Sequence, residues 1–441
     1  MLQLALPVAA VQLGIMAMGV IDTIMVGHVS QVALVSAALG NLYFFLPVIF
    51  GQGTLMALDP VVSQAVGARD DVAISRALQR GIVLSLALTV VTCATFVPVA
   101  WVLTALRQPP EAIPDAALYV RVAIPGVFPF YAFIVLRQSL QAMNRVAPVL
   151  WTVLAANVLN AGLNWVFIYG NLGSPVLGVG GSSLATSISR WAMALTLLAV
   201  AGRDIYGRLT PWRPETGAIG PLIRMLRLGI PIGLQYSLEY GAFYAAALLM
   251  GVLGTTQLAA HQIAINLASF TFMVPLGVST ATAVLVGQAI GAGDEARARR
   301  SAIAGIVIGT AFMCLSGLVF HFFPQALART YTRDAAVIGL AATLIPIAGV
   351  FQVFDGIQAV AAGVLRGIGD THAPAIINVV GFWLIGLPVS WLLAFRYGGG
   401  AIGLWWGIVV GLAAVAIILL VRVRVRLGRS MRRVIIDDVA S

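Results

Sequence analysis

Four acidic residues lie inside or at the edge of long apolar segments of this sequence: Asp22, Asp59, Glu239 and Asp355. An ionised side chain at the centre of a bilayer costs at least about 2.5–3.5 kcal/mol on insertion scales, so such residues are rare and usually functional. Few basic residues are available to pair with them, because no Arg lies deep in any of these segments apart from Arg121 and Arg190, which are nearer to the ends. A bound cation or a proton would therefore serve as the partner of these carboxylates.

Glu239 belongs to a stripe of polar and aromatic residues. Gln235 and Tyr236 precede it by four and three residues, and Phe243 follows it by four. Residues at this spacing share one face of a helix. A carboxylate beside aromatic rings suits a cationic, partly apolar ligand through charge and cation–π attraction, so we interpret the stripe as part of a substrate cleft. The alternative is a polar contact that holds helices together.

Asp355 is flanked by Gln352 and Gln358, three residues to either side, and by Phe351 four residues before it. This spacing places the side chains on neighbouring parts of one helix face. We assign Phe351 and Gln352 to the same substrate cleft. Competition between an organic cation and Na⁺ or H⁺ at Glu239 and Asp355 would be a direct exchange mechanism.

Asp22 lies deep in the first apolar segment. The fifth segment carries Asn157, Asn160 and Asn164 at the spacing of one helix face. A carboxylate with amide oxygens suits Na⁺, and it could equally hold a proton. The alternative is a hydrogen-bond network between helices, and the sequence does not say whether the two segments touch.

Asp59 and His261 are weaker candidates. Asp59 directly precedes Pro60, which favours a structural role as the N-cap of a short helix. His261 begins the eighth apolar segment, and we expect a neutral, hydrogen-bonded imidazole there.

The composition indicates a membrane protein. Of 441 residues, 60% are hydrophobic and 10% are charged, whereas soluble domains have about 25% charged residues. The net charge of +10 comes from Arg residues clustered between apolar segments, and no continuous basic face is present to follow a nucleic acid. The charge therefore reports membrane topology rather than nucleic-acid binding.

Twelve apolar segments are long enough for membrane helices, which need about 20 residues each. They span approximately 2–26, 33–57, 74–103, 116–141, 147–169, 178–201, 225–253, 258–286, 298–323, 335–363, 375–395 and 401–421. With the N-terminus in the cytoplasm, most Arg residues fall on the cytoplasmic side, including six in the tail after residue 421. This bias predicts that both termini are cytoplasmic.

The sequence repeats itself with a spacing of 224 residues. Ser63–Asp70 (SQAVGARD) returns as Gly287–Asp294 (GQAIGAGD), and Leu6-Pro7 returns as Ile230-Pro231. Six segments per half give both halves the same direction in the membrane. We therefore predict an N-terminal six-helix lobe (1–201), a cytoplasmic linker (202–223), a C-terminal six-helix lobe (224–421) and a basic cytoplasmic tail (422–441).

No enzyme signature is present. The sequence lacks a Walker A loop, a Gly-x-Ser-x-Gly elbow and a zinc-binding HExxH motif. Its two cysteines support neither a disulfide framework nor a metal site. We expect no catalytic residues and no cofactor apart from the coupling ion.

The chain resembles the MATE (multidrug and toxin extrusion) family, most closely its bacterial NorM-like branch. The resemblance covers essentially the whole chain. Its motifs are Gly19–His28 (GVIDTIMVGH), Ser63–Ala68 (SQAVGA), Glu239 with Ala259–Asn266 (AAHQIAIN), and Asp355–Asp370 (DGIQAVAAGVLRGIGD).

This resemblance implies two six-helix lobes around a V-shaped cleft, and exchange of organic cations for Na⁺ or H⁺. It implies coupling roles for Glu239 and Asp355, and for Asp22 with Asn160 and Asn164. Thr186 is a weaker member of the site around Asp22. NorM-like proteins tend to have Tyr where this chain has Phe351, which removes one hydroxyl ligand for Na⁺.

The sequence thus predicts a monomeric drug/cation antiporter of the bacterial inner membrane. Its partners would be cationic lipophilic small molecules and the lipid bilayer. One alternative is a flippase for lipid-linked saccharides from a related superfamily, which would need a cationic cleft. Others are a membrane-embedded enzyme or structural protein, and an importer with two six-helix halves.

Overall fold

The computed structural model describes residues 1–437, apart from the side chains of Gln31 and Arg203. The last four residues of the predicted tail, 438–441, lie outside the described residues. Over the described range the chain contains twelve helical segments that are long and apolar enough to cross a membrane. They begin and end within a few residues of most predicted boundaries, so the expected all-helical fold with twelve spans is confirmed.

Contacts divide the chain into two compact units, with boundaries inside the first and the seventh span. The N-terminal unit comprises Ala10–Gly233 and the tail from Ile435, and the C-terminal unit comprises Met1–Ala9 and Leu234–Val434. The predicted division into lobes, linker and tail stays a prediction. The segment 202–223 is largely helical, because the helix of the sixth span continues past a kink at Gly202 to Leu209, and the helix of the seventh span begins at Ile219.

The N-terminal unit is built from the first nine α-helices. They are α1 (Leu2–Gly27), α2 (Gln31–Leu55), α3 (Leu58–Gly67), α4 (Asp71–Phe96), α5 (Val99–Ala105), α6 (Ile113–Ala123), α7 (Val127–Ala142), α8 (Ala147–Tyr169) and α9 (Gly178–Leu209). The 3₁₀ turn η1 (Ile124–Gly126) joins α6 to α7, so that the two helices form one span. Helix α9 packs against α6, α7 and α8, so the sixth span contacts the fourth and fifth spans of this unit.

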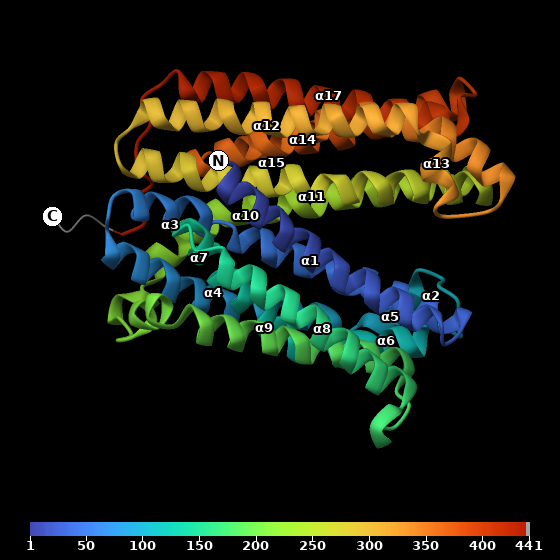
Figure 1. Ribbon diagram of the computed structural model, residues 1–441, viewed down its shortest axis with the longest axis horizontal. Helices are drawn as coiled ribbons and strands as arrows, with labels where there is room; N and C mark the ends of the chain where they lie inside the picture. The colour runs from blue at the N-terminus through green and yellow to red at the C-terminus, as the bar shows by residue number, and fades with distance from the viewer. Residues whose placement is uncertain (438–441) are drawn as a thin grey trace. The chain divides into compact units, whose positions relative to one another are not determined.

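The C-terminal unit is built from the remaining helices. They are α10 (Ile219–Leu253), α11 (Thr255–Gly291), α12 (Glu295–Phe322), α13 (Pro324–Arg329), α14 (Ala335–Ile368), α15 (His372–Asn378), α16 (Leu387–Trp391) and α17 (Gly400–Leu427). Helix α14 packs against α11, α12 and α17 along much of its length, as Figure 1 shows. Buried side chains of α14 therefore form the centre of this unit.

The repeated motif adopts the same local structure in both units. Asp70 and Asp294 each cap the following helix, accepting hydrogen bonds from the backbone N–H of Ala73 at 2.9 Å and of Arg297 at 2.8 Å. The preceding residue has a left-handed backbone in both copies, with φ of 56° at Arg69 and 73° at Gly293. The repeat therefore encodes one helix–turn–helix junction twice, although only the second copy has the glycine that this conformation favours.

The eleventh span departs from regular α-helix. Between α15 and α16 the backbone forms the π-helix η4 (Val379–Gly386), and a second π segment, η5 (Leu392–Arg396), follows α16. Gly386 lies against Gly411 of α17, where a Cβ atom would meet the Gly411 Cα at 3.4 Å. π-Helical turns are frequent at functional sites, because they re-aim the side chains on either side of them.

Candidate functional site: two buried clusters of carboxylates

Asp22 lies at the centre of a buried polar cluster in the N-terminal unit. Its Oδ1 accepts a hydrogen bond from Asn164 Nδ2 at 2.6 Å, and its Oδ2 accepts one from Thr186 Oγ1 at 2.7 Å. Asn164 also donates to Asn160 Oδ1 at 3.1 Å, and Asn160 donates to Thr186 Oγ1 at 3.4 Å. The first, fifth and sixth spans therefore meet at one carboxylate, whose two oxygens both face hydrogen-bond donors.

Arg190 follows Thr186 by one helical turn and is buried in the same unit. Its guanidinium carbon lies 4.5 Å from the centre of the Phe44 ring and 5.1 Å from that of Phe130. It is attracted electrostatically to Asp22. Arg190 is residue 13 of the 25-residue span Gly178–Gly202, so the expectation that it lies near a segment end is wrong.

Two weaker candidates lie apart from the Asp22 cluster. Asn157 donates instead to the backbone oxygens of Gly14 and Val153 at 2.9 and 2.8 Å, and so joins α8 to α1. Asp59 is buried in the first turn of α3, but the N-cap position belongs to Ala57, so the predicted N-cap role is wrong.

Glu239 is the centre of the second cluster, which lies in the C-terminal unit. Its Oε1 accepts a hydrogen bond from Gln358 Nε2 at 3.0 Å, and its Oε2 accepts one from Asn378 Nδ2 at 3.2 Å. The donors come from α14 and from the end of α15, directly before the π-helix η4. Three spans are therefore joined at this carboxylate.

Asp355 is the second acid of this cluster and is only 6% exposed. It lies close enough to Glu239 for the two carboxylates to repel each other when both are ionised. Among the described residues, neither acid forms an ion pair with a basic side chain. The buried amide oxygens Oε1 of Gln358 and Oδ1 of Asn378 also have no hydrogen-bond partner within this part of the chain. The cluster therefore offers carboxylate and amide oxygens with no internal positive charge.

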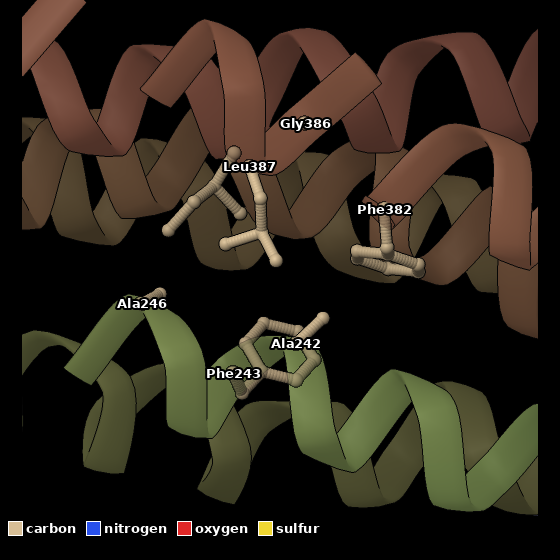
Figure 2. Close-up of a pocket in the computed structure, with 7 residues that line it drawn as sticks. Ala242, Phe243, Ala246, Phe382, Gly386 and Leu387 are labelled. Atoms are coloured by element: carbon tan, nitrogen blue, oxygen red, sulfur yellow. The ribbon is translucent and has the colours of Figure 1, made fainter. Parts of the chain in front are cut away.

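Aromatic rings follow directly from the Glu239 cluster. Phe243, one turn after Glu239, packs its ring at 5.9 Å from Phe351 and at 5.8 Å from Phe382. Figure 2 shows the apolar pocket beside these rings, where Phe243 and Ala242 of α10 face Phe382 and Leu387 of the eleventh span. The acids are thus continued by an apolar, aromatic surface.

Comparison with known proteins finds one family model that matches this chain twice, once in each half. The family model described as MatE matches residues 7–166 and again residues 231–392, so the second match begins 224 residues after the first. This chain belongs to the MatE family. The double match has the same spacing as the sequence repeat, which is thereby confirmed. As a MatE protein with twelve spans, the chain is a multi-pass membrane protein.

Relatives of this MatE protein are similar over nearly their whole length. A probable multidrug resistance protein NorM of Mesorhizobium japonicum is 40% identical, covering 96% of this chain and 92% of the relative. A multidrug resistance protein NorM of Burkholderia vietnamiensis is 37% identical, with 95% and 91% covered. The eukaryotic MATE transporter AtDTX14 has the same fold, with a TM-score of 0.88 at 22% identity over 96% and 94% of the two chains.

Two residues predicted for the MatE substrate cleft form hydrogen bonds with groups other than the acids. Both polar atoms of the Gln352 amide form hydrogen bonds: Thr271 donates to its Oε1 at 2.7 Å, and Ser316 accepts from its Nε2 at 3.0 Å. Tyr236 accepts a hydrogen bond from Arg366 Nη1 at 3.2 Å. Gln235 is buried on α10, one turn before Glu239.

His261 is also placed differently from the expectation. Its ring is 2% exposed and lies 5.6 Å from the ring of Trp405, between centroids. Its Nδ1 has no hydrogen-bond partner among the described residues, so the expected hydrogen-bonded imidazole is wrong in this detail. The histidine packs as part of the aromatic core of the C-terminal unit.

Sequence reasoning missed two residues of these MatE clusters. Asn378 follows a proline-containing motif in the eleventh span and has no acidic neighbour in sequence, so only the tertiary fold reveals its bond to Glu239. The spacing of Arg190 could have predicted its place, because an Arg four residues after the predicted cluster member Thr186 lies on the same helix face.

Proposed function

We propose that this protein is a secondary-active efflux transporter that exchanges organic cations for Na⁺ or H⁺. The observation that carries the proposal is the pair of acids, the half-buried Glu239 and the buried Asp355, without a basic partner among the described residues. Two carboxylates in a membrane interior are costly unless a positive charge joins them. A proton, a Na⁺ ion or the charged group of a drug would supply that charge.

The surroundings of the acids support an organic cation as the transported substrate. Beyond Glu239 lie Phe243 and the apolar pocket that it shares with Phe382. A ligand with one positive charge and an apolar aromatic body would pair its charge with the acids and stack its body on the rings. The NorM relatives are named as multidrug resistance proteins, which agrees with such a substrate.

Exchange requires the coupling ion and the substrate to bind the two orientations of the transporter with different affinities. We assign this competition to Glu239 and Asp355, with Gln358 and Asn378 as supporting amides. The free amide oxygens of both residues are suitable ligands for Na⁺, which prefers hard oxygen donors. A proton would instead bind one carboxylate and remove the repulsion between the two.

The remaining assignments follow from the same proposal. Arg residues on the predicted cytoplasmic side orient the protein in the bacterial inner membrane with both termini inside. The transporter acts as a monomer and is not an enzyme. Coupling at Asp22, Asn160 and Asn164 is the second assignment predicted from sequence. We place it behind the Glu239 pair because Asp22 already has a positive charge nearby.

The test is ethidium efflux from drug-sensitive cells that express the protein, energised by a Na⁺ gradient or a pH gradient separately. We expect Glu239→Gln and Asp355→Asn each to reduce efflux to the level of empty cells, with normal amounts of protein in the membrane. The exposed acid Glu111 provides the matched control, since Glu111→Gln makes the same chemical change outside the cluster. Full efflux by both cluster variants would reject the assignment.

A further inference from the structure

Arg190 is a buried cation in the middle of a membrane span, and the proposed exchange reaction does not use it. Arg190 is 8% exposed, and its guanidinium lies on the faces of the Phe44 and Phe130 rings. An Arg side chain remains protonated in proteins. The N-terminal unit therefore holds a fixed positive charge near its acid, whereas among the described residues no cation is paired with the acids of the C-terminal unit.

The position of Arg190 is set by a row of hydrogen bonds along α9. Ser183, Ser187 and Trp191 donate to the backbone oxygens of Tyr119, Val122 and Pro125 at 2.6, 3.1 and 3.0 Å. These bonds fix α9 against α6 and the turn η1. They leave the face with Thr186 and Arg190 turned toward Asp22 and the two rings.

Among the described residues, Asp22 is the acid that interacts with this guanidinium. The other titratable groups that interact with Arg190 are Tyr119 on α6 and Tyr131 on α7, and both are neutral phenols at ordinary pH. Between the described residues Asp22 and Arg190 there is no direct ion pair, so the attraction acts without contact between the two charged groups. In a medium of low dielectric constant such an attraction is much stronger than in water.

The hydrogen bonds around Asp22 point the same way. Asn164 and Thr186 donate to its two oxygens, and Asn160 donates to the Thr186 hydroxyl, which leaves that hydroxyl proton for Asp22. Burial favours the neutral form of Asp22, whereas the donors on both oxygens and the charge of Arg190 favour the ionised carboxylate. An ionised Asp22 together with Arg190 has no net charge, so this cluster is balanced without a bound cation.

We propose that Arg190 is a tethered counter-ion of Asp22. Its guanidinium on an aromatic surface takes the place that a bound cation would take in the N-terminal unit. Arg190 is thus a specificity-determining residue, which keeps Na⁺ and small organic cations away from Asp22 and leaves exchange to Glu239 and Asp355. Only this last consequence rests on the proposed function; the pairing of Arg190 with Asp22 does not.

The first test is chemical rescue of the purified protein in lipid nanodiscs, with thermal unfolding as the readout. Arg190→Ala removes the guanidinium and leaves the rings and Asp22. We expect a lower unfolding temperature, and millimolar n-propylguanidinium should raise it by several degrees in this variant but not in the parent protein. The same compound should have no effect on Asp22→Asn/Arg190→Ala. Absence of rescue, or equal rescue of the double variant, would overturn the proposal.

A second set of variants keeps the proposal testable if Arg190→Ala does not fold. Asp22→Asn leaves an unpaired buried cation, whereas Asp22→Asn/Arg190→Gln removes both charges and keeps similar side-chain volumes. We expect the double variant to be clearly more stable than Asp22→Asn alone, because a buried charge without its partner is costly. Arg190→Lys retains the charge and should behave like the parent protein. Additive losses in the double variant would contradict the pairing.

Transport measurements then separate this inference from the proposed function. We expect Asp22→Asn/Arg190→Gln to keep most of the efflux of the parent, while Asp22→Asn loses at least about tenfold through its unpaired cation. If the double variant loses efflux completely while its stability recovers, Asp22 has a coupling role and the specificity claim is wrong. If the parent itself shows no efflux, the proposed function fails, and the unfolding experiments still decide whether Arg190 pairs with Asp22.

Discussion

The two units carry the same helical repeat but opposite charge arrangements around their buried acids. In the N-terminal unit, Asp22 has two hydrogen-bond donors and the nearby cation Arg190. In the C-terminal unit, Glu239 also has two amide donors, but its charged neighbour is another acid, Asp355. One cluster is therefore balanced, and the other is short of positive charge.

The repeat shows how local these differences are. Ala246 lies 224 residues after Asp22, the repeat spacing, and it lines the apolar pocket beside Phe243. In the other direction, the residue 224 before Glu239 is Ile15. Later in the chain the repeat spacing is 226, as Ala147-Pro148 and Ala373-Pro374 show, and the residue 226 before Asp355 is Pro129. The duplicated scaffold thus carries an acid where its copy carries an apolar residue, in both directions. We infer that the two units have different roles: the acids of the C-terminal unit bind cations, and the acid of the N-terminal unit is part of a structural cluster without net charge.

The largest expected effect comes from removing the charges of one unit at a time. Glu239→Gln/Asp355→Asn should abolish efflux driven by either gradient, because no acid of the C-terminal cluster remains for the coupling ion. Asp22→Asn/Arg190→Gln removes two charges of the other unit and should keep efflux. Drug efflux of both double variants at matched membrane levels is the measurement. Equal loss in the two would break the comparison.

The next effect concerns the amides that hold Glu239. Replacing Asn378 by Leu removes a hydrogen bond to a charged group, and such bonds are worth about 1.5–3 kcal/mol. We therefore expect roughly a tenfold or greater loss of coupled efflux from Asn378→Leu, measured as the initial rate. Asn157→Leu is the matched control, because Asn157 bonds only backbone oxygens in the other unit. An unchanged rate in Asn378→Leu would remove Asn378 from the site.

The sequence predicted the architecture well, for a physical reason. A membrane helix must form all of its backbone hydrogen bonds internally and present a continuous apolar surface to lipid. Its length can therefore be read from the length of the apolar segment. The junctions at Asp70 and Asp294 are equally predictable from sequence, since a repeated motif with a capping acid encodes a local structure. The π-helical eleventh span was not predicted, because periodicity does not distinguish it from α-helix over a few turns.

The candidate site was predicted only in part. Buried acids stand out in an apolar sequence, and Asp22, Asn160, Asn164 and Thr186 do form one cluster. Which amide reaches which acid depends on helix rotation and tertiary packing. Gln352 and Gln358 flank Asp355 symmetrically in sequence, yet only Gln358 bonds Glu239. Spacing places residues on a face but does not tell what that face meets.

A smaller effect is expected from the hydroxyl that supports Asp22. Thr186→Val keeps the shape of the side chain and removes its donor to Asp22, at a cost of about 1–2 kcal/mol in the free energy of unfolding. If the cluster is structural, stability falls while the ratio of Na⁺-driven to proton-driven efflux stays constant. Thermal unfolding and efflux of Thr186→Val, with Thr186→Ser as the control that keeps the hydroxyl, would measure both. A changed ratio would return coupling to the N-terminal unit.

The smallest effect is expected from a second pair of an acid and an Arg, in which the acid is partly exposed to solvent. Asp437 of the tail accepts a hydrogen bond from Arg80 at 2.6 Å, and Arg76 lies 3.4 Å from its other oxygen. Burial alone raises the pKa of Asp437, but the hydrogen bond and charge of Arg80, with the charge of Arg76, outweigh it and bring the pKa below its ordinary value. This pair should contribute at most about 1 kcal/mol, as partly exposed ion pairs do.

Because the pKa of Asp437 is lower in the folded protein, its contribution is complete above the unfolded pKa of about 3.9 and disappears as the pH falls through the folded value. Asp437→Asn should therefore lower the unfolding temperature slightly at neutral pH, and the difference from the parent should vanish in strong acid. Asp22→Asn should cause a larger loss at neutral pH, since Asp22 is buried whereas the side chain of Asp437 is 30% exposed. A tail variant as damaging as Asp22→Asn would show that burial does not set the strength of these pairs, and would remove the physical basis for treating Arg190 as a special counter-ion.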